Sequence, residues 1–417
     1  MAKSRSLQKF DRLTIFIYLA LVAMGWVNIY SASLDDTSSF FQFSHVYFKQ
    51  LIWMGLSVLL ILFILTLDTK FYERFSSIIY LVAIVLLLGL FLFGKNVNGA
   101  TSWYALGSVS VQPSEFAKVA TALALAKYLS GIQTNLNEFK HQLRSFLIIA
   151  VPALIIIPQP DPGSALVFVA FVFPLYREGL PFMYLLLGFL AVALFIGTLA
   201  LGTVWAFMIA VLITGIVYFK NRKRKPKVLR YTAIVAGFAA YIFLAHYVFN
   251  NVFEQRHRDR FNIVLGMEMD SRGIGYNTKQ SEIAIGSGGW SGKGWTQGTQ
   301  TKGNFVPEQQ TDYIFSTVGE EWGFLGSTAV VVLFVALILR VLYLAERQKS
   351  QFSRVYGYGV GALLFLHFFI NIGMVTGLLP TIGIPLPFFS YGGSGLWAFT
   401  ILLFIFVRLD GRNYYYT

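Results

Sequence analysis

The chain lacks cysteine and has few charged residues for its length. Only 13% of its 417 residues are Asp, Glu, Lys or Arg, whereas soluble domains carry about 25%. The absence of cysteine excludes disulfides and thiol catalysis. The five histidines show no HExxH or other paired ligand spacing, and no GxSxG turn occurs, so neither a histidine metal site nor a serine–histidine triad is expected. Carboxylates are left as the candidates for chemistry.

Hydrophobic residues, by contrast, make up 56% of the chain, and the mean hydropathy is +0.62. They fall into runs of about 18 to 25 residues, each long enough to cross roughly 30 Å of hydrocarbon as a helix. The alternating segments of about ten residues that indicate a transmembrane β-barrel are absent. The sequence therefore predicts an all-α polytopic membrane protein, with residues 1–417 forming a single integral membrane domain.

We expect about 10 to 12 transmembrane helices, with a large outward-facing loop at 251–312 before the last three. The first run is too long, and too rich in Trp and Tyr, for a signal peptide, so it is expected to be retained. The sixth run is short, and only Leu-Gly-Thr separates the seventh from the eighth. The expected spans are 13–33, 46–67, 72–93, 114–130, 143–158, 164–176, 180–200, 203–219, 230–250, 313–342, 354–377 and 391–408.

Basic residues mark one face of the membrane. Seven Lys and Arg side chains lie in the turn at 220–230, and four more precede the first run. Because Lys and Arg in short loops gather on the cytoplasmic side, we expect this basic turn and both termini to be cytoplasmic. The cluster at 220–230 is expected to contact anionic lipid rather than nucleic acid. Polar chemistry then collects on the outer face.

Ionisable residues inside apolar runs indicate either a function or a buried partner. Glu115 and Lys118 lie three residues apart, on one face at the start of the fourth run. They form either a structural ion pair or the wall of a cavity for a charged substrate. Asp161, in the turn QPDPGS, either caps the next helix or belongs to the same cavity.

The last apolar region, at 371–396, is interrupted by three prolines and the pair Gly392–Gly393. Broken backbone at membrane depth is tolerated where it is buried in protein or lines a cavity. This region is therefore predicted to form part of a substrate groove.

The outer loop at 251–312 is too long for a simple connection. Its segment GSGGWSGKG fails the spacing of a phosphate-binding loop, because Lys293 is followed by Gly294 rather than Ser or Thr. Asp270, in GMEMDSRGIGYN, is framed by glycines in the middle of the loop. From the residues alone it is either a turn-forming aspartate or a catalytic carboxylate.

Five motifs, in order between residues 98 and 394, resemble the SEDS family of shape, elongation, division and sporulation proteins. Within that family, GKGWTQGTQ is more similar to the rod-shape members than to the division members. The motifs are NGATSWYALGSVSVQPSEFAK, QPDPGS, GIGYNTKQSEIAIGSGGWSGKGWTQGTQ, FVPEQQTDYIFSTVGEEWGFLG and NIGMVTGLLPTIGIPLPFFSYGGS.

The resemblance implies a peptidoglycan glycosyltransferase that polymerises lipid II during cell-wall elongation and rod-shape maintenance. It would act in the bacterial cytoplasmic membrane, its active site on the outer face, with a class B penicillin-binding protein as partner. It also implies that the carboxylate in the pattern Asp-Pro-x-Gly-x-Gly-Tyr is essential. Here that carboxylate is Asp270, and Ser271 stands where the proline is usual. The family usually spans the membrane ten times, so two further crossings are expected around 180–250.

We expect Asp270 to be the general base on a sugar hydroxyl. No metal ligand is expected, the cofactor is left open although a divalent cation could assist the leaving group, and the expected partners are lipid II and membrane lipids, with no nucleic acid. A lipid II flippase, a scaffold without activity and a division-specific member of the family stay as alternatives. The substrate or cavity residues are expected to be Glu115, Lys118, Asp161, Arg260, Gln280, Ser281, Lys293, Glu308, Thr311, Asp312, Ser390, Gly392 and Gly393.

Overall fold

The protein is a multi-pass α-helical membrane protein. Among the residues that its computed structural model describes, ten helices are long and apolar enough to cross a membrane. This agrees with the predicted fold class. The described residues are 10–34, 45–97, 99–107, 109–222, 227–267 and 274–411.

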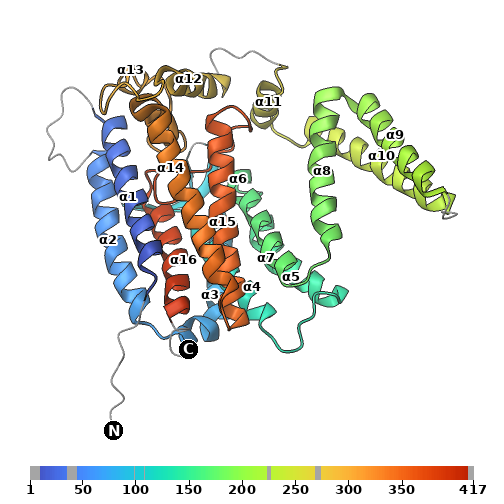
Figure 1. Cartoon of the computed structure of the whole chain (residues 1–417), viewed down its shortest axis with the longest axis horizontal. Helices are drawn as coiled ribbons and strands as arrows, with labels where there is room; N and C mark the ends of the chain where they lie inside the picture. The colour runs from blue at the N-terminus through green and yellow to red at the C-terminus, as the bar shows by residue number, and fades with distance from the viewer. Residues whose placement is uncertain are drawn as a thin grey trace, which may run out of the picture. The chain divides into compact units, whose positions relative to one another are not determined.

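The helices and strands follow one another along the chain as labelled in Figure 1. Their bounds are α1 (Arg12–Ala32), α2 (Val46–Thr66), α3 (Thr69–Phe93), β1 (Lys95–Val97), β2 (Ala100–Leu106), β3 (Val109–Val111), α4 (Pro113–Leu129), α5 (Phe139–Ile156), α6 (Pro162–Leu166), the 3-10 helix η1 (Val167–Phe171), α7 (Val172–Arg177), α8 (Phe182–Leu201), α9 (Thr203–Asn221), α10 (Val228–Asn251), α11 (Gln255–Val264), α12 (Ile274–Ser287), α13 (Thr299–Lys302), α14 (Ile314–Glu346), α15 (Gln351–Val375) and α16 (Gly393–Gly411).

Each of the twelve predicted spans corresponds to helical structure, with ends that differ by a few residues. Besides the ten long helices, the fourth span is the shorter helix α4, and the sixth is the broken helical stretch Pro162–Arg177. The break between the seventh and eighth spans is a single residue, Gly202, with φ at +84°. Residues that carry a Cβ rarely adopt that backbone conformation. Glycine therefore allows α8 to end and α9 to begin without a longer loop.

Two features of the fold were not predicted from the sequence. The strands form a three-stranded antiparallel sheet in the order β1-β2-β3, and helices α11, α12 and α13 lie within 251–312. Two of the strands have only three residues, too few to show the alternation by which a strand is read from sequence. The sheet is fastened to its surroundings by Tyr104, whose hydroxyl donates to the carbonyl of Leu86 in α3 at 2.8 Å.

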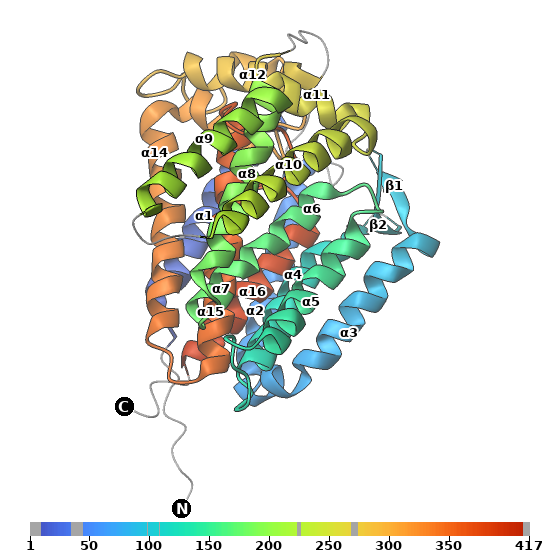
Figure 2. The ribbon, with the colours of Figure 1, turned by 90° about the vertical axis from the view of Figure 1, so that its right-hand side faces the viewer.

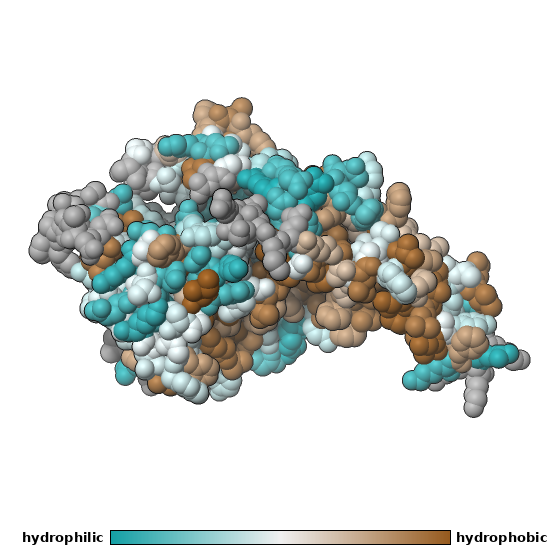
Figure 3. Space-filling view, turned by 90° about the horizontal axis from the view of Figure 1, so that it is seen from above, coloured by the Kyte–Doolittle hydropathy of each residue, from teal (hydrophilic) through white to brown (hydrophobic). Residues whose placement is uncertain are grey.

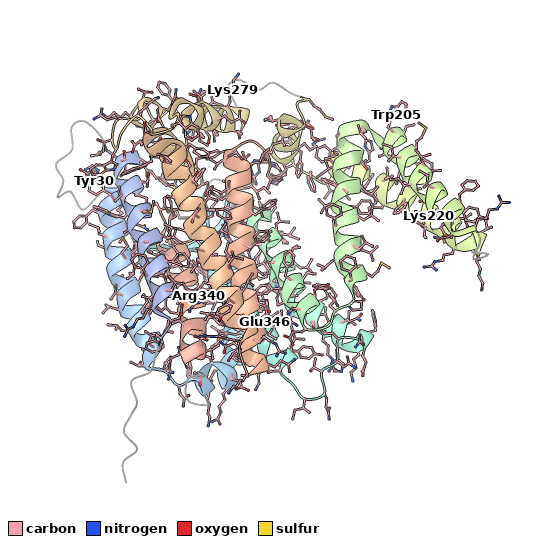
Figure 4. The ribbon with its side chains drawn as sticks, in the orientation of Figure 1. Tyr30, Trp205, Lys220, Lys279, Arg340 and Glu346 are labelled. Atoms are coloured by element: carbon pink, nitrogen blue, oxygen red, sulfur yellow. The ribbon has the colours of Figure 1, made fainter. Side chains whose placement is uncertain are left out.

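The chain divides into two compact units, Met1–Leu180 with Asn277–Thr417 (unit 1) and Pro181–Tyr276 (unit 2). In unit 2, α8, α9 and α10 pack against one another, and Figure 4 shows Trp205 and Lys220 at opposite ends of α9. The ring of Phe261 in α11 makes edge contacts with Phe195 of α8 and Phe249 of α10, at centroid distances of 5.7 and 6.0 Å. A single membrane domain stays a prediction.

Unit 1 is a bundle in which α4 is the most deeply buried of the early helices. It packs against α3, α5, α15 and α16, while α14 packs against α1 and α15 (Figures 1 and 2). Five alanines of α4, from Ala117 to Ala126, are buried, and side chains this small let neighbouring helices approach closely in a membrane protein. This close packing brings the polar residues of α4 into contact with α15.

At one end of unit 1, Arg340 of α14 and Arg347, directly after that helix, pair with carboxylates at the start of α1 and at the end of α16. Arg340 Nε lies 3.2 Å from Asp11 Oδ2, and Arg347 Nη2 lies 2.9 Å from Asp410 Oδ2. The start of α1 and the end of α16 are therefore at the same end of the bundle, where Figure 4 also shows Arg340 and Glu346. Burial raises the pKa of Asp11, but hydrogen bonds from Arg340 and Thr14 outweigh it and hold the pKa at about 2.

Neutralising Asp11 is expected to destabilise unit 1. Asp11→Asn keeps an acceptor for the N–H of Thr14 but loses the charge that Arg340 binds. Because the folded pKa of Asp11 lies below 3.8, its contribution is present above pH 3.8 and is lost as the pH falls towards 2. We expect a loss of about 2 kcal/mol at neutral pH, seen as a lower Tm in detergent.

The matched control is Glu346→Gln, which breaks the exposed pair with Arg177. An exposed pair contributes about 0–1 kcal/mol, so this variant should unfold close to the wild-type temperature. Equal Tm values for the two variants at neutral pH would contradict the role given to Asp11.

Candidate functional site

A buried ion pair lies in the first turns of α4. The helix begins at Pro113, and Glu115 in its first turn is placed where a negative charge complements the helix dipole. Lys118 Nζ lies 2.8 Å from Glu115 Oε1, and the two residues are 2% and 4% exposed. Of the two possibilities that the sequence left open, the structure contains the ion pair, and a contact with substrate stays a prediction.

The ion pair extends to α15 through His367, a residue that was not among the candidates. Lys118 Nζ lies 3.0 Å from His367 Nε2, and the ammonium lies 5.1 Å from the centroid of the Phe399 ring in α16. His367 is 1% exposed. The cluster formed by Glu115, Lys118 and His367 is called the α4–α15 cluster below.

Asp161 caps the helix that follows it, as one of the two interpretations predicted. Its Oδ1 accepts from the N–H of Ser164 at 3.0 Å, and its Oδ2 accepts from the side-chain amide of Gln112 at 2.9 Å. Gln112 directly precedes α4, so the cap joins the start of α6 to the start of α4. A Cβ on Gly163 would lie 2.7 Å from the carbonyl oxygen of Ile382, so glycine is needed where this turn meets the broken segment.

The irregular backbone between α15 and α16 is held by a second polar residue of α15. The side-chain amide of Asn371, one turn beyond His367, donates to the carbonyl oxygens of Asp312 and Ile384 at 2.8 and 2.7 Å. Asn371 is fully buried. The backbone of Asp312 is thereby joined to α15 next to the α4–α15 cluster, and a contact of its side chain with substrate stays a prediction.

Lys293 pairs with a buried carboxylate of α14. Its ammonium lies 2.8 Å from Oε1 of Glu320, a fully buried residue of α14. The backbone N–H groups of Gln300 and Thr301 donate to the same carboxylate at 2.8 and 2.9 Å. Glu320 therefore holds the glycine-rich segment through Lys293 and two backbone N–H groups, and a contact of Lys293 with substrate stays a prediction.

The candidates Ser281 and Thr311 form hydrogen bonds with residues outside the α4–α15 cluster. Ser281 donates to the carbonyl of Val375 at 2.8 Å, and Thr311 donates to Glu308 Oε2 at 3.1 Å. Gln280 is half-buried in α12.

Three further candidates lie at the broken segment and the start of α16. Ser390 Oγ accepts from the N–H of Leu386 at 2.9 Å. Gly392 donates to Gln50 of α2 at 3.3 Å, and Gly393 lies against the ring of Trp53. Their role with substrate stays a prediction.

Asp270 lies outside the described residues, and Arg260 lies in unit 2 on α11. Arg256, His257 and Arg260 share one side of that helix by their spacing of three and four residues. Burial, and the positive charges of Arg256 and Arg260, lower the pKa of His257. Arg256 is paired with Glu254 at 2.8 Å, and a contact of Arg260 with substrate stays a prediction.

His367 could have been found from the sequence. It is an ionisable residue inside an apolar helix, and such residues by default indicate a partner or a function. Its partner could not have been found in the same way, because Lys118 is 249 positions away in the sequence. Among the described residues, no group of three or more His, Asp or Glu is placed to hold a metal ion.

The end of unit 1 that carries α12 and α13 is polar. Figure 3 views the molecule from this end and shows hydrophilic residues gathered there, with hydrophobic residues exposed among them. The starts of α4, α6 and α14 lie towards this end, opposite the arginine pairs of Asp11 and Asp410. The fold and site define a class, a multi-pass membrane protein that buries a charged cluster between its helices near one end.

Comparison with known proteins identifies the family. The family model described as cell cycle protein, for FtsW, RodA and SpoVE, matches residues 11–201 and 177–415. Peptidoglycan glycosyltransferase MrdB of Escherichia coli (strain K12) is 32% identical over 387 residues, which cover 93% of this chain and 89% of that protein. Peptidoglycan glycosyltransferase RodA of Treponema pallidum (strain Nichols) is 31% identical over 433 residues, covering 98% and 99%.

A solved structure described as "Structural coordination of polymerization and crosslinking by a peptidoglycan synthase complex" is similar along its whole length. It has a TM-score of 0.73 and 26% sequence identity, and the match covers 99% of this chain and 100% of that chain. The chain therefore belongs to the SEDS family of peptidoglycan glycosyltransferases. The resemblance carried by the five motifs is confirmed.

Breaking the ion pair from one side is expected to destabilise the protein more than removing both charges. Lys118→Met leaves the Glu115 carboxylate buried without a counter-charge, at a cost on the order of 3–5 kcal/mol. The double variant Glu115→Gln with Lys118→Met has no buried charge and similar volumes. We expect its Tm in detergent to recover most of the loss.

A matched control is available on the same helix. Lys127 lies 3.6 Å from Glu73 in an exposed pair, so Lys127→Met should leave the Tm close to wild type. A Tm for Lys118→Met no lower than that of Lys127→Met would show that the buried pair does not support the fold.

Proposed function

We propose that this enzyme polymerises lipid II into glycan strands on the outer face of the bacterial cytoplasmic membrane, during cell-wall elongation and rod-shape maintenance. Membership of the SEDS family supports glycosyl transfer, and relatives named RodA and MrdB support the elongation role. The motif GKGWTQGTQ adds to the same assignment over the division branch.

The orientation follows from the distribution of basic residues. Arg340, Arg347, Arg354 and Arg408 lie at the end of unit 1 where α1 begins and α16 ends. Basic residues at the ends of membrane helices favour the cytoplasmic side. Both termini are then cytoplasmic, and the end with α12, α13 and the start of α4 faces outwards.

The position of the charged groups is the observation that favours a polymerase over a flippase. Glu115 and Asp161 belong to the first turns of their helices, rather than to the middle of a span. A transporter places its essential charges near the midplane of the bilayer, where the substrate crosses. Charges near the outer end suit an enzyme that meets the head group of a lipid at the surface.

In the proposed reaction, Asp270 removes the proton from a hydroxyl of the acceptor sugar. The resulting oxygen forms a bond with the anomeric carbon of the donor, and the bond between that carbon and the lipid pyrophosphate breaks. The proton passes to the carboxylate, and the pyrophosphate leaves as an anion. A general base contributes about 10²–10⁴-fold, and a second acid is not required because pyrophosphate is already a good leaving group.

Positive charge is needed where the pyrophosphate departs. The side of α11 with Arg256 and Arg260 suits that task, and it is close to Asp270 in the sequence. A divalent cation could share it, so the cofactor stays open. We also propose a class B penicillin-binding protein as partner, supported by the likeness to a peptidoglycan synthase complex that couples polymerisation and crosslinking.

Substituting the proposed base should abolish polymerisation without unfolding the protein. Asp270→Asn keeps the size of the side chain but cannot accept the proton, so the rate of glycan formation should fall at least about 100-fold. The measurement is polymer formed from lipid II by the purified enzyme with its penicillin-binding partner, together with the Tm.

Glu268→Gln is the matched control, because it removes a carboxylate two residues away in the same loop. This variant should polymerise at close to the wild-type rate. Normal glycan strands from Asp270→Asn would rule out the assignment, and a wild-type pair that binds lipid II but makes no polymer would favour the flippase.

A further inference from the structure

His367 is a buried titratable residue that the proposed reaction does not use. It lies within α15, eight residues before the end of the helix, and is 1% exposed. A buried imidazole without partners would lose its hydrogen bonds to water, so its contacts should explain its presence. Both ring nitrogens have one.

The two contacts determine the tautomer of the ring. His367 Nδ1 lies 3.2 Å from the carbonyl oxygen of Pro385, which can only accept, so Nδ1 carries the hydrogen. Nε2 then has a lone pair and accepts from the ammonium of Lys118 at 3.0 Å. A neutral ring is thus the state that satisfies both neighbours, because a proton on Nε2 would face the Lys118 charge.

The Lys118 ammonium is fixed from three directions. Glu115 Oε1 accepts at 2.8 Å, His367 Nε2 accepts at 3.0 Å, and the Phe399 ring lies 5.1 Å away. An ammonium has three N–H donors, and an aromatic face attracts a cation. The Phe399 ring also meets the imidazole edge-on, with centroids 4.7 Å apart. His367 therefore limits where the ammonium can move.

Lys118 binds only one of the two carboxylate oxygens of Glu115. Glu115 Oε2 is buried and accepts no hydrogen bond from any of the residues that the structure describes. A buried carboxylate oxygen without a donor is costly, and it is suited to a ligand that brings an O–H or N–H group. The hydroxyl and acetamido groups of an amino sugar are such donors.

We propose that His367 is a positioning residue, which holds Lys118 so that Glu115 presents its unpaired oxygen to a hydroxyl or amide N–H of the sugar substrate. Through its contact with Pro385, His367 also joins the ion pair to the broken segment between α15 and α16. A movement of that segment would therefore change the position of the Lys118 ammonium. The proposal rests on the proposed function for the nature of the substrate.

Two amide variants at one position separate the two contacts of the ring. His367→Gln places an amide oxygen near the position of Nε2, where it can accept from Lys118. His367→Asn is shorter and reaches only towards Pro385. We expect His367→Gln to keep kcat/KM for lipid II within about threefold of wild type, and His367→Asn to lose about 10- to 100-fold.

The Tm of both variants is measured alongside the rate, because a purely structural role would lower the two rates and the two Tm values together. Equal kcat/KM for both variants would overturn the proposal. If His367→Asn does not fold, His367→Gln alone decides, since a loss of kcat/KM of more than about tenfold in a variant with a wild-type Tm would overturn the proposal. Failure of the wild-type enzyme to form polymer would instead count against the proposed function.

Discussion

A charge inside a bundle of membrane helices must be neutralised by neighbouring side chains, because lipid provides neither water nor counter-ions. Four buried carboxylates of unit 1 follow this constraint, two towards each end. Asp11 is held by Arg340 of α14 and Asp410 by Arg347, directly after α14, at one end. Glu115 and Glu320 are held by lysines towards the other. Three of these pairs join different segments of the chain, whereas Glu115 and Lys118 lie in one helix and reach α15 through His367.

The same constraint applies to backbone groups, and α15 meets it for the broken segment that follows. A helix satisfies its own N–H and C=O groups, but the irregular backbone of residues 376–392 cannot do so. Asn371 serves the carbonyls of Asp312 and Ile384, and Ser390 accepts from the N–H of Leu386. His367 donates to the carbonyl of Pro385 in the same way, and its other ring nitrogen accepts from Lys118. One polar face of α15 therefore supports the broken backbone and the ion pair together.

The sequence was sufficient to predict the features that are determined within one segment of the chain. Spans follow from the length of apolar runs, and Glu115 with Lys118 follows from helical spacing. The role of Glu320 could not be predicted, because its donors Lys293, Gln300 and Thr301 reach it only after the glycine-rich segment has folded. The contact of His367 with Lys118 joins two distant helices, and nothing in the spacing of either run indicates which polar residues will meet. The short strands carried too few residues to show a period.

The two buried Glu–Lys pairs differ in a way that bears on their roles. Glu320 Oε1 accepts from Lys293 and from the N–H of Gln300, while Oε2 accepts from both the N–H and the hydroxyl of Thr301. That carboxylate has no oxygen left for a ligand, as expected of a group whose work is to hold a loop. Glu115 has a partner on one oxygen only. Since folding alone favours saturating a buried carboxylate, the unsaturated one is the better candidate for contact with substrate, and its cost to stability is a reason to expect that function retains it.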